Sequence, residues 1–148
     1  MTEIQTERLI LRTNCTVTEG KLSFPDQPPF TSLLDIKPAK AEDSGFAICL
    51  NTGELIGHIG ILFKRKPYEL TIGIDDERHR KCGYMTEAQD AAIQWIFDNC
   101  DTMQVTALIG PITPVASRKL CERNGFHEAK EGKDEWWILD KADFKKPE

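Results

Sequence analysis

The residues best suited to chemistry lie between Arg78 and Glu87, where four basic or potentially basic side chains at positions 78–81 come shortly before Gly83. Small or apolar residues then recur at the spacing of a core-facing helix, at Ala88, Ala91, Ala92, Trp95 and Ile96. The first N–H groups of a helix have no intrahelical partner, and the helix dipole favours negative charge there. A glycine lets a ligand come close to the backbone. The stretch therefore predicts an anion site, suited to phosphate, at the start of a helix.

The elements that must position this loop lie on both sides of it. Residues 70–74 are short and rich in branched side chains, which predicts a strand leading into the loop. The helix after the loop is expected to end near Asn99. The remaining elements follow in order: a strand over 102–109, a short helix through 116–121 that ends at the cap signal Asn124-Gly125, and strands over 126–129 and 135–139.

The N-terminal half predicts an antiparallel meander with one irregular excursion. Residues 7–12 alternate charged and apolar side chains, as a first strand does. Prolines in the segment 13–44 disfavour long helices, so a mostly irregular lid or linker is expected there, with a short strand near 33–36 and a helical turn near 39–43. Strands over 46–50, 55–63 and 68–74 follow, the first two joined by a turn at 51–54. The order of elements predicts one α+β domain over 1–148 with a mixed sheet.

Composition narrows the class of protein. A formal net charge of −5 argues against general nucleic-acid binding, because neutralising phosphates takes a basic face. No apolar run approaches the ~20 residues of a membrane span, and the N-terminus does not resemble a signal peptide. The five cysteines have neither CxxC nor Cys/His spacing, so neither a metal site nor a disulfide framework is predicted. We expect a soluble, cytoplasmic protein without a membrane or nucleic-acid partner.

Two motifs, in this order, resemble those of the GNAT family of acetyl-CoA-dependent N-acetyltransferases. Residues 80–85, RKCGYM, are similar to the family's pyrophosphate loop, Gln/Arg-x-x-Gly-x-Gly/Ala. Residues 117–126, SRKLCERNGF, are similar to the second signature, a Ser-bearing helix that ends in Gly-Phe. Residues 6–12, TERLILR, and 83–88, GYMTEA, look like the RimJ/RimL branch, which acetylates protein N-termini and small amines. The resemblance covers nearly the whole chain except 13–44.

This resemblance implies a fold and a cofactor. The fold would be a mostly antiparallel central sheet of about six to seven strands, with helices on both faces and a shortened N-terminal helical region. The cofactor would be acetyl-CoA, its pyrophosphate bound by the loop backbone and its pantetheine and acetyl carbonyl by the preceding strand, which splays from its neighbour. The cofactor-binding residues implied are Ile72, Ile74, Asp75, Arg80, Lys81, Cys82, Gly83, Tyr84, Met85 and Ser117.

Three residues match family positions that handle protons during direct attack of an amine on the thioester. Glu69 matches a carboxylate that receives the amine's proton, directly or through water; alternatively it is a solvated strand-end carboxylate paired with a lysine. Cys121 stands where many members place the tyrosine that protonates the leaving thiolate, and is otherwise a small buried apolar residue. Ser117 is the second candidate acid, or makes a plain cofactor or helix-surface hydrogen bond.

Two classes of function stay open. The first is an N-acetyltransferase acting on a small amine or a peptide N-terminus. The second is a CoA-binding regulatory or scaffolding module whose catalytic groups have decayed. Met85, Pro114 and the missing tyrosine motivate the second class, since Pro114 stands where the second motif usually carries Asn. Generic nucleotide binding is a weaker alternative, because neither GxxxxGK nor GxGxxG is present. The sequence names no acceptor and leaves a homodimer open.

Overall fold

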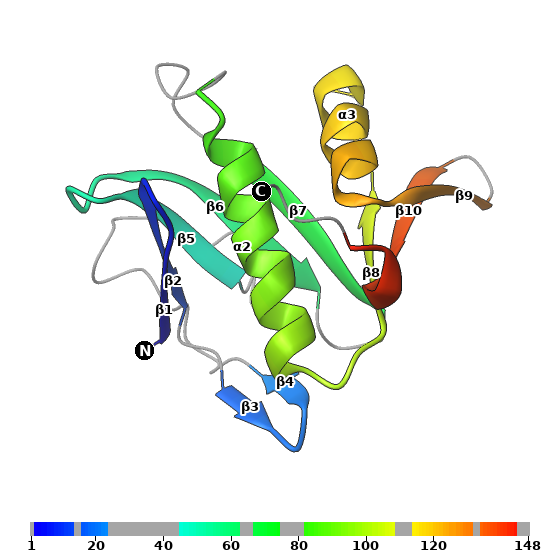
Figure 1. Ribbon diagram of the computed structural model, residues 1–148, viewed down its shortest axis with the longest axis horizontal. Coiled ribbons are helices and arrows are strands. Elements are labelled where there is room, and N and C mark those ends of the chain that lie inside the picture. The colour runs from blue at the N-terminus through cyan, green and yellow to red at the C-terminus, as the bar shows by residue number, and fades with distance from the viewer. Residues whose placement is uncertain are drawn as a thin grey trace.

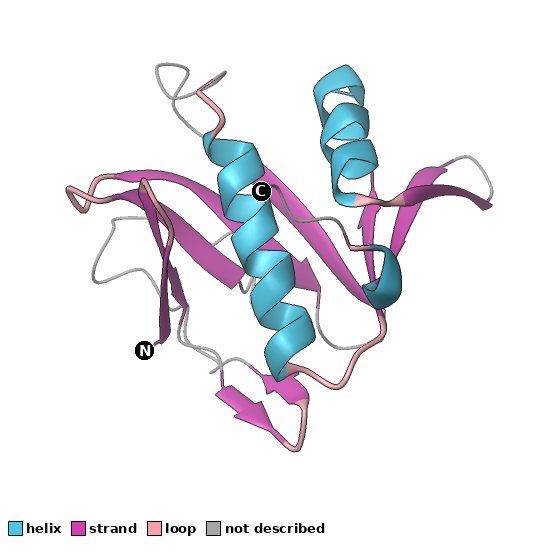
Figure 2. Ribbon diagram, viewed as in Figure 1, coloured by secondary structure: helices cyan, strands magenta, loops and turns pink. Residues whose placement is uncertain are grey.

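The described residues form one eight-stranded sheet, a separate two-stranded hairpin and two α-helices (Figures 1 and 2). The computed structural model describes residues 2–13, 16–23, 45–62, 67–74, 82–108, 114–131 and 134–144. The strands are β1 (Thr2–Gln5), β2 (Leu9–Thr13), β3 (Thr16–Thr18), β4 (Lys21–Ser23), β5 (Gly45–Leu50), β6 (Leu55–Leu62), β7 (Tyr68–Ile74), β8 (Gln104–Leu108), β9 (His127–Glu131) and β10 (Asp134–Asp140). The helices are α2 (Tyr84–Asn99) and α3 (Pro114–Asn124), with a 3₁₀ turn, η2 (Lys141–Asp143). The α+β class is confirmed.

The main sheet runs in the order β1-β2-β5-β6-β7-β8-β10-β9 and is antiparallel at every junction but one. Strands β2, β5, β6 and β7 are neighbours in the sheet and follow in that order along the chain, with the separate β3–β4 hairpin between β2 and β5, which confirms the antiparallel meander. Strands β7 and β8 are parallel, because α2 carries the chain back along the sheet between them. The sheet has eight strands rather than six or seven, because the N-terminal residues form a hairpin of β1 with β2 instead of one strand.

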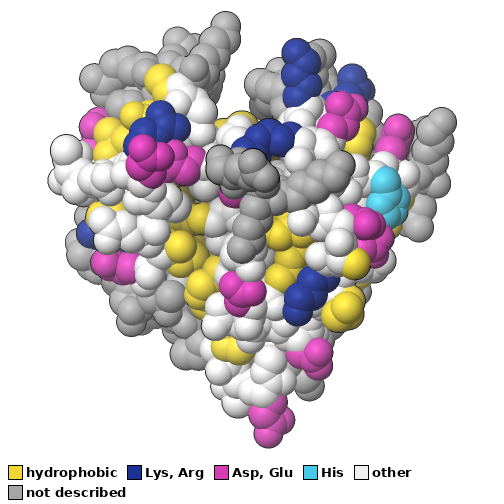
Figure 3. Space-filling view, viewed as in Figure 1, with side chains coloured by type: hydrophobic (Ala, Val, Ile, Leu, Met, Phe, Trp, Pro, Cys, Tyr) yellow, Lys and Arg dark blue, Asp and Glu magenta, His cyan; other side chains and the backbone are white. Residues whose placement is uncertain are grey.

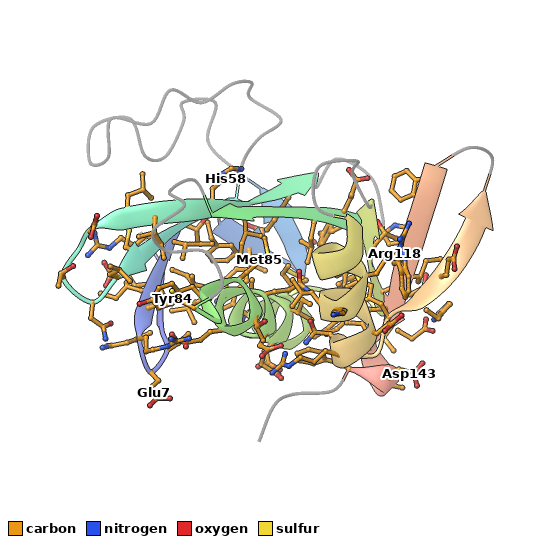
Figure 4. All side chains as sticks on the ribbon, turned by 90° about the horizontal axis from the view of Figure 1, so that it is seen from above. Glu7, His58, Tyr84, Met85, Arg118 and Asp143 are labelled. Carbon is orange, nitrogen blue, oxygen red and sulfur yellow. The ribbon has the colours of Figure 1, made fainter. Side chains whose placement is uncertain are left out.

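Both described helices lie on one face of this sheet, side by side (Figure 4). Helix α2 buries Ala88, Ala92, Ile93, Ile96 and Phe97. These side chains join the core with the sheet residues Leu9, Leu11, Phe46, Ile48, Ile59 and Ile61. Ala91 and Trp95, which the periodicity also assigned to the buried face, are only partly buried. The expected strand near 33–36 and helical turn near 39–43 lie outside the described residues, and helices on the opposite face stay a prediction.

The hairpin of β3 and β4 occupies part of the segment that was expected to be mostly irregular. Its turn residues Glu19 and Gly20 both have positive φ, 52° and 75°, as a type I′ turn requires. The sequence signal is weak because Glu-Gly stands where Asn-Gly or Asp-Gly is usual. The Asp101 N–H donates to the Gly20 carbonyl oxygen over 2.6 Å. This bond docks the hairpin on the connection between α2 and β8.

A polar network joins α2 to α3 and fixes one helix relative to the other. Asn124, at the end of α3, is 0% exposed. Its Nδ2 donates to Asp90 Oδ1, and its Oδ1 accepts from Gln89 Nε2 over 2.8 Å. Arg123 Nη1 lies 3.0 Å from both carboxylate oxygens of Asp90. Because Gln89 and Asp90 belong to α2, the network holds the two helices in one arrangement.

The described residues hold little that points to a membrane, a disulfide or a metal. None of the described helices is long and apolar enough to cross a membrane. Cys49, Cys82, Cys100 and Cys121 are free thiols. Within the described ranges, no group of three His, Cys, Asp or Glu side chains is placed to hold a metal ion.

Candidate active site

The candidate site begins where the ladder between β7 and β8 ends. Tyr68, Glu69 and Leu70 pair with Val105, Thr106 and Ala107. The described residues form no further pair beyond Leu70, although β7 continues to Ile74 and β8 to Leu108. β7 stays paired with β6 as far as Ile74. Residues 109–113, which follow β8, lie outside the described residues. Where a strand lacks a neighbour, an extended ligand can add to it through main-chain hydrogen bonds.

The predicted main-chain ligands Ile72 and Ile74 lie in β7, two and four residues after Leu70. The splaying of this strand from its neighbour just before the basic loop stays a prediction, because the residues after β8 lie outside the described ranges. Asp75, Arg80 and Lys81 lie outside the described residues. The contact of all five with a cofactor stays a prediction.

Two helix N-termini converge at the same end of the molecule. Helices α2 and α3 both begin beyond the carboxyl ends of the parallel strands β7 and β8 (Figure 1). Their dipoles place partial positive charge there, and open sheets bind ligands at this edge of parallel strands. Lys and Arg side chains lie at this end, beside Asp and Glu side chains (Figure 3), and Arg118 and Lys119 of α3 are exposed. The arrangement suits an anionic ligand.

Gly83 shapes the start of α2. It is exposed, occupies the N-cap position and has φ 82° and ψ 4°, in the left-handed region that glycine adopts without strain. It has no side chain that could accept hydrogen bonds from the first-turn N–H groups. Among the described residues, a Cβ on Gly83 would meet only Arg8 Nη2, at 3.1 Å.

The side chains on either side of Gly83 leave it exposed. Cys82, before it, is exposed. Tyr84 and Met85 are partly buried and pack against the hydrophobic core, and Met85 points from α2 toward the sheet (Figure 4). A methionine at the last position of the loop motif is therefore compatible with an open loop, because its side chain turns inward.

Arg8 and Glu87 connect this loop to the β1–β2 hairpin, and sequence reasoning missed them as site residues. Arg8 Nε lies 2.8 Å from Glu87 Oε1, and the Arg8 backbone N–H donates to Glu87 Oε2 over 2.9 Å. Arg8 Nη1 donates to the Cys82 carbonyl oxygen over 2.8 Å. Its guanidinium carbon also lies 4.5 Å from the centre of the Tyr84 ring. Arg8 and Glu87 are 79 residues apart in the chain. In the sequence, only the family resemblance of residues 6–12 and 83–88 pointed to these two positions.

The same contacts set the charge of both side chains. Burial alone raises the pKa of Glu87, but hydrogen bonds from Thr6 and Arg8 outweigh it and hold that pKa below its usual value. The hydrogen bond with Glu87 raises the pKa of the Arg8 guanidinium. Both groups are therefore ionised at neutral pH, and Glu87 turns toward the hairpin rather than toward the mouth of the loop.

The predicted proton-handling residues come from opposite faces of the sheet. Tyr68 and Leu70 belong to the core under α2, so Glu69 between them points to the other face. Cys121, on α3, is 4% exposed and belongs to that core. Ser117 lies four residues before Cys121 in α3. Glu69 pairs with Thr106, one residue before the last described pair of the β7–β8 ladder. Their catalytic roles stay predictions.

Comparison with known proteins gives the family. The sequence model of the acetyltransferase (GNAT) domain matches residues 25–127. No curated protein matches the chain significantly in sequence.

Solved structures share the fold. An acetyltransferase from Agrobacterium tumefaciens has 22% identity and a TM-score of 0.66, with 94% of each chain covered. Mycobacterium smegmatis RimJ, in complex with CoA-disulfide, has 17% identity and a TM-score of 0.56 over 66% of this chain and 52% of that one. A spermidine N-acetyltransferase, SpeG F149G from Vibrio cholerae, has 17% identity and a TM-score of 0.58 over 67% and 64%. A domain match over more than half of the chain and the shared fold agree: this protein belongs to the GNAT acetyltransferase family.

Proposed function

We propose that this enzyme transfers the acetyl group of acetyl-CoA to a primary amine, either a small amine or a peptide N-terminus, by direct attack within a ternary complex. The observation that carries the proposal is the start of α2 at Gly83, beyond the carboxyl ends of the parallel strands β7 and β8. The helix start suits a pyrophosphate, and the strand that leads to it, β7, suits the extended thioester arm that ends in that pyrophosphate. Acetyl-CoA supplies an acyl group activated as a thioester.

In this proposal the main chain holds the donor. The backbone of the loop from Arg80 to Met85 binds the pyrophosphate. Main-chain groups of Ile72, Ile74 and Asp75 bind the pantetheine and polarise the acetyl carbonyl, so that the negative charge developing on its oxygen is stabilised. Ser117, near the start of α3, adds a hydrogen bond to the cofactor.

Glu69 handles the proton of the attacking amine. Its place on the face opposite α2 suggests that the acceptor approaches from that face. A neutral amine nitrogen forms the new C–N bond, the C–S bond breaks, and the nitrogen loses its proton to Glu69 or to water. An α-amine has a pKa near 8, so a minor fraction is already neutral at pH 7. Loss of Glu69 should therefore lower kcat only modestly.

Cys121 and Ser117 are the candidates for returning a proton to the leaving thiolate of CoA. A thiol at position 121 could donate this proton only from the core side of the sheet, because Cys121 is 4% exposed. A proton donor that is buried in this way also favours the second candidate function, a CoA-binding module with weak or no turnover. The two functions differ in turnover and not in cofactor binding.

Calorimetric titration with acetyl-CoA, followed by thiol release with a panel of amines and N-terminal peptides, tests the proposal. We expect binding heat without acceptor and CoA release that depends on one class of amine. Binding without turnover across the whole panel would favour the regulatory module. Absence of both binding heat and thermal shift would contradict either function.

A further inference from the structure

We propose that Arg8 is a positioning residue for the cofactor site: it holds the Cys82–Gly83 peptide so that the Gly83 N–H faces the pyrophosphate. The inference rests on the proposed function, since it assumes that CoA binds at the start of α2. Arg8 belongs to the turn between β1 and β2 and reaches the loop across the surface of the molecule. Arg8 influences acetyl transfer only through the loop that it orients.

The argument begins with the geometry of one peptide bond. In a trans peptide the carbonyl oxygen and the following N–H point in opposite directions. Arg8 Nη1 holds the Cys82 carbonyl oxygen at 2.8 Å. The Gly83 N–H must therefore point away from Arg8. Fixing one end of the peptide fixes the other.

Because residue 83 is a glycine, the peptide before it could take either of two orientations, and the bond from Arg8 is needed to fix one of them. Gly83, with φ 82° and ψ 4°, has the backbone of the third residue of a type II turn. Reversing the peptide before it gives the type I arrangement with negative φ, which glycine adopts about as readily. The reversed peptide would aim the Cys82 carbonyl oxygen, instead of an N–H, at the phosphate. The bond from Arg8 selects the orientation that binds an anion.

Arg8 also offsets a charge that would oppose the ligand. Glu87 is the acidic residue in the first turn of α2, close to where the phosphates are proposed to bind. Its carboxylate accepts from Thr6 Oγ1, from the Arg8 backbone and from Arg8 Nε. Without the guanidinium, a partly buried negative charge would remain beside the site and repel the pyrophosphate.

Arg8→Lys tests the proposal, because it keeps the positive charge but loses the forked geometry that reaches Glu87 and Cys82 together. CoA binding is measured by calorimetry without acceptor, and acetyl transfer is compared for two donors, acetyl-CoA and S-acetylpantetheine, which ends before the pyrophosphate. We expect roughly tenfold weaker CoA binding, as for a lost charge-assisted hydrogen bond. The KM for acetyl-CoA should rise with kcat nearly unchanged, and transfer from S-acetylpantetheine should equal that of the wild type.

Arg12→Lys is the matched control. Arg12 lies in β2 and pairs with Glu3 at 3.1 Å, about 13 Å further along the strand than Arg8. Arg12→Lys should leave CoA binding unchanged, and also the rate of acetyl transfer from acetyl-CoA and from S-acetylpantetheine. Urea unfolding of both variants separates a loss of stability from a loss of loop orientation.

The double variant Arg8→Gln with Glu87→Gln separates the two parts of the argument. It removes both charges, so any remaining loss of CoA affinity reports on the orientation of the peptide. A full return to wild-type affinity would overturn the orientation argument.

The outcomes for the inference and for the proposed function are distinguishable. Equal losses for acetyl-CoA and S-acetylpantetheine in Arg8→Lys, or no loss with either, would overturn the positioning role while the wild type still binds CoA. If the wild type itself binds no CoA, the proposed function fails first.

Discussion

Glu87 shows how one residue can serve the fold while standing beside a ligand site. A carboxylate in the first turn of a helix interacts favourably with the dipole, but a phosphate bound there would compete with it. Here the side chain, 19% exposed, is turned to the β1–β2 hairpin and engaged by Thr6 and Arg8. The helix start is thereby tied to the hairpin without a side chain covering Gly83.

Glu87→Gln should therefore change how stability depends on pH. The folded pKa of Glu87 lies below its usual value, which is near 4.3 in unfolded chains. The carboxylate thus stabilises the fold at pH values above about 4.3, and this contribution is lost as the pH falls through the folded pKa. Urea unfolding from pH 7 to pH 3 should show wild type more stable than Glu87→Gln at pH 7, with the difference shrinking in acid. A difference that stays constant over this range would contradict the assignment.

At the scale of elements, the packing of α3 against α2 depends on one amide. Asn124 is fully buried and is bonded to Gln89 and Asp90. Arg123 reaches the same carboxylate from the rim, with a side chain 36% exposed. The buried partner should matter more than the exposed one, because removing it leaves polar groups without hydrogen bonds in the interior.

Asn124→Ala should lower the free energy of unfolding by about 2 kcal/mol, within the range for leaving buried polar groups unsatisfied. Arg123→Ala, the matched control on the same carboxylate, should cost less than about 1 kcal/mol because its ion pair is partly solvated. Urea denaturation of the three proteins measures both values. Equal costs would mean that the exposed ion pair, and not the buried amide, holds the helices together.

The sequence predicted those elements whose signal lies within the element itself. The periodicity after Gly83 predicted α2, the branched run at 70–74 predicted most of β7, and the Asn124-Gly125 signal predicted the end of α3. The β3–β4 hairpin was missed because its Glu-Gly turn carries a weak version of the type I′ signal. Local pattern alone could not distinguish it from an irregular segment.

The candidate site was predictable where a motif names it and not where it depends on tertiary contact. The glycine at 83 and the periodicity after it predicted a helix that begins there, and the structure confirms that start. The bonds from Arg8 to Glu87 and Cys82 join segments more than 70 residues apart. No spacing rule links such positions in a single sequence, because the fold alone brings them together.

At the scale of the whole molecule, β7 and β8 join two parts of the sheet. Among the described residues, the β1-β2-β5-β6-β7 part meets the β8-β10-β9 part through three residue pairs between these strands. The proposed cofactor site lies beyond the carboxyl ends of the two strands, with β7 and α2 on one side and α3 on the other. A ligand there contacts both parts, so its binding should stabilise the molecule as a unit.

CoA should therefore raise the melting temperature by an amount set by mass action. At a concentration 100 times Kd, a ligand that binds only the folded state adds about 2.7 kcal/mol, which for a domain of this size is a rise of roughly 5–10 °C. Gly83→Val should lose most of this rise at the same CoA concentration, because its backbone, at φ 82°, is strained for a β-branched residue and its side chain would displace Arg8, whose Nη2 lies 3.1 Å from the Cβ position. Cys82→Ala should keep the rise, since the loop uses only the main chain at that position. Differential scanning calorimetry with and without CoA makes the comparison, and an equal loss in both variants would contradict a site built on the backbone at Gly83.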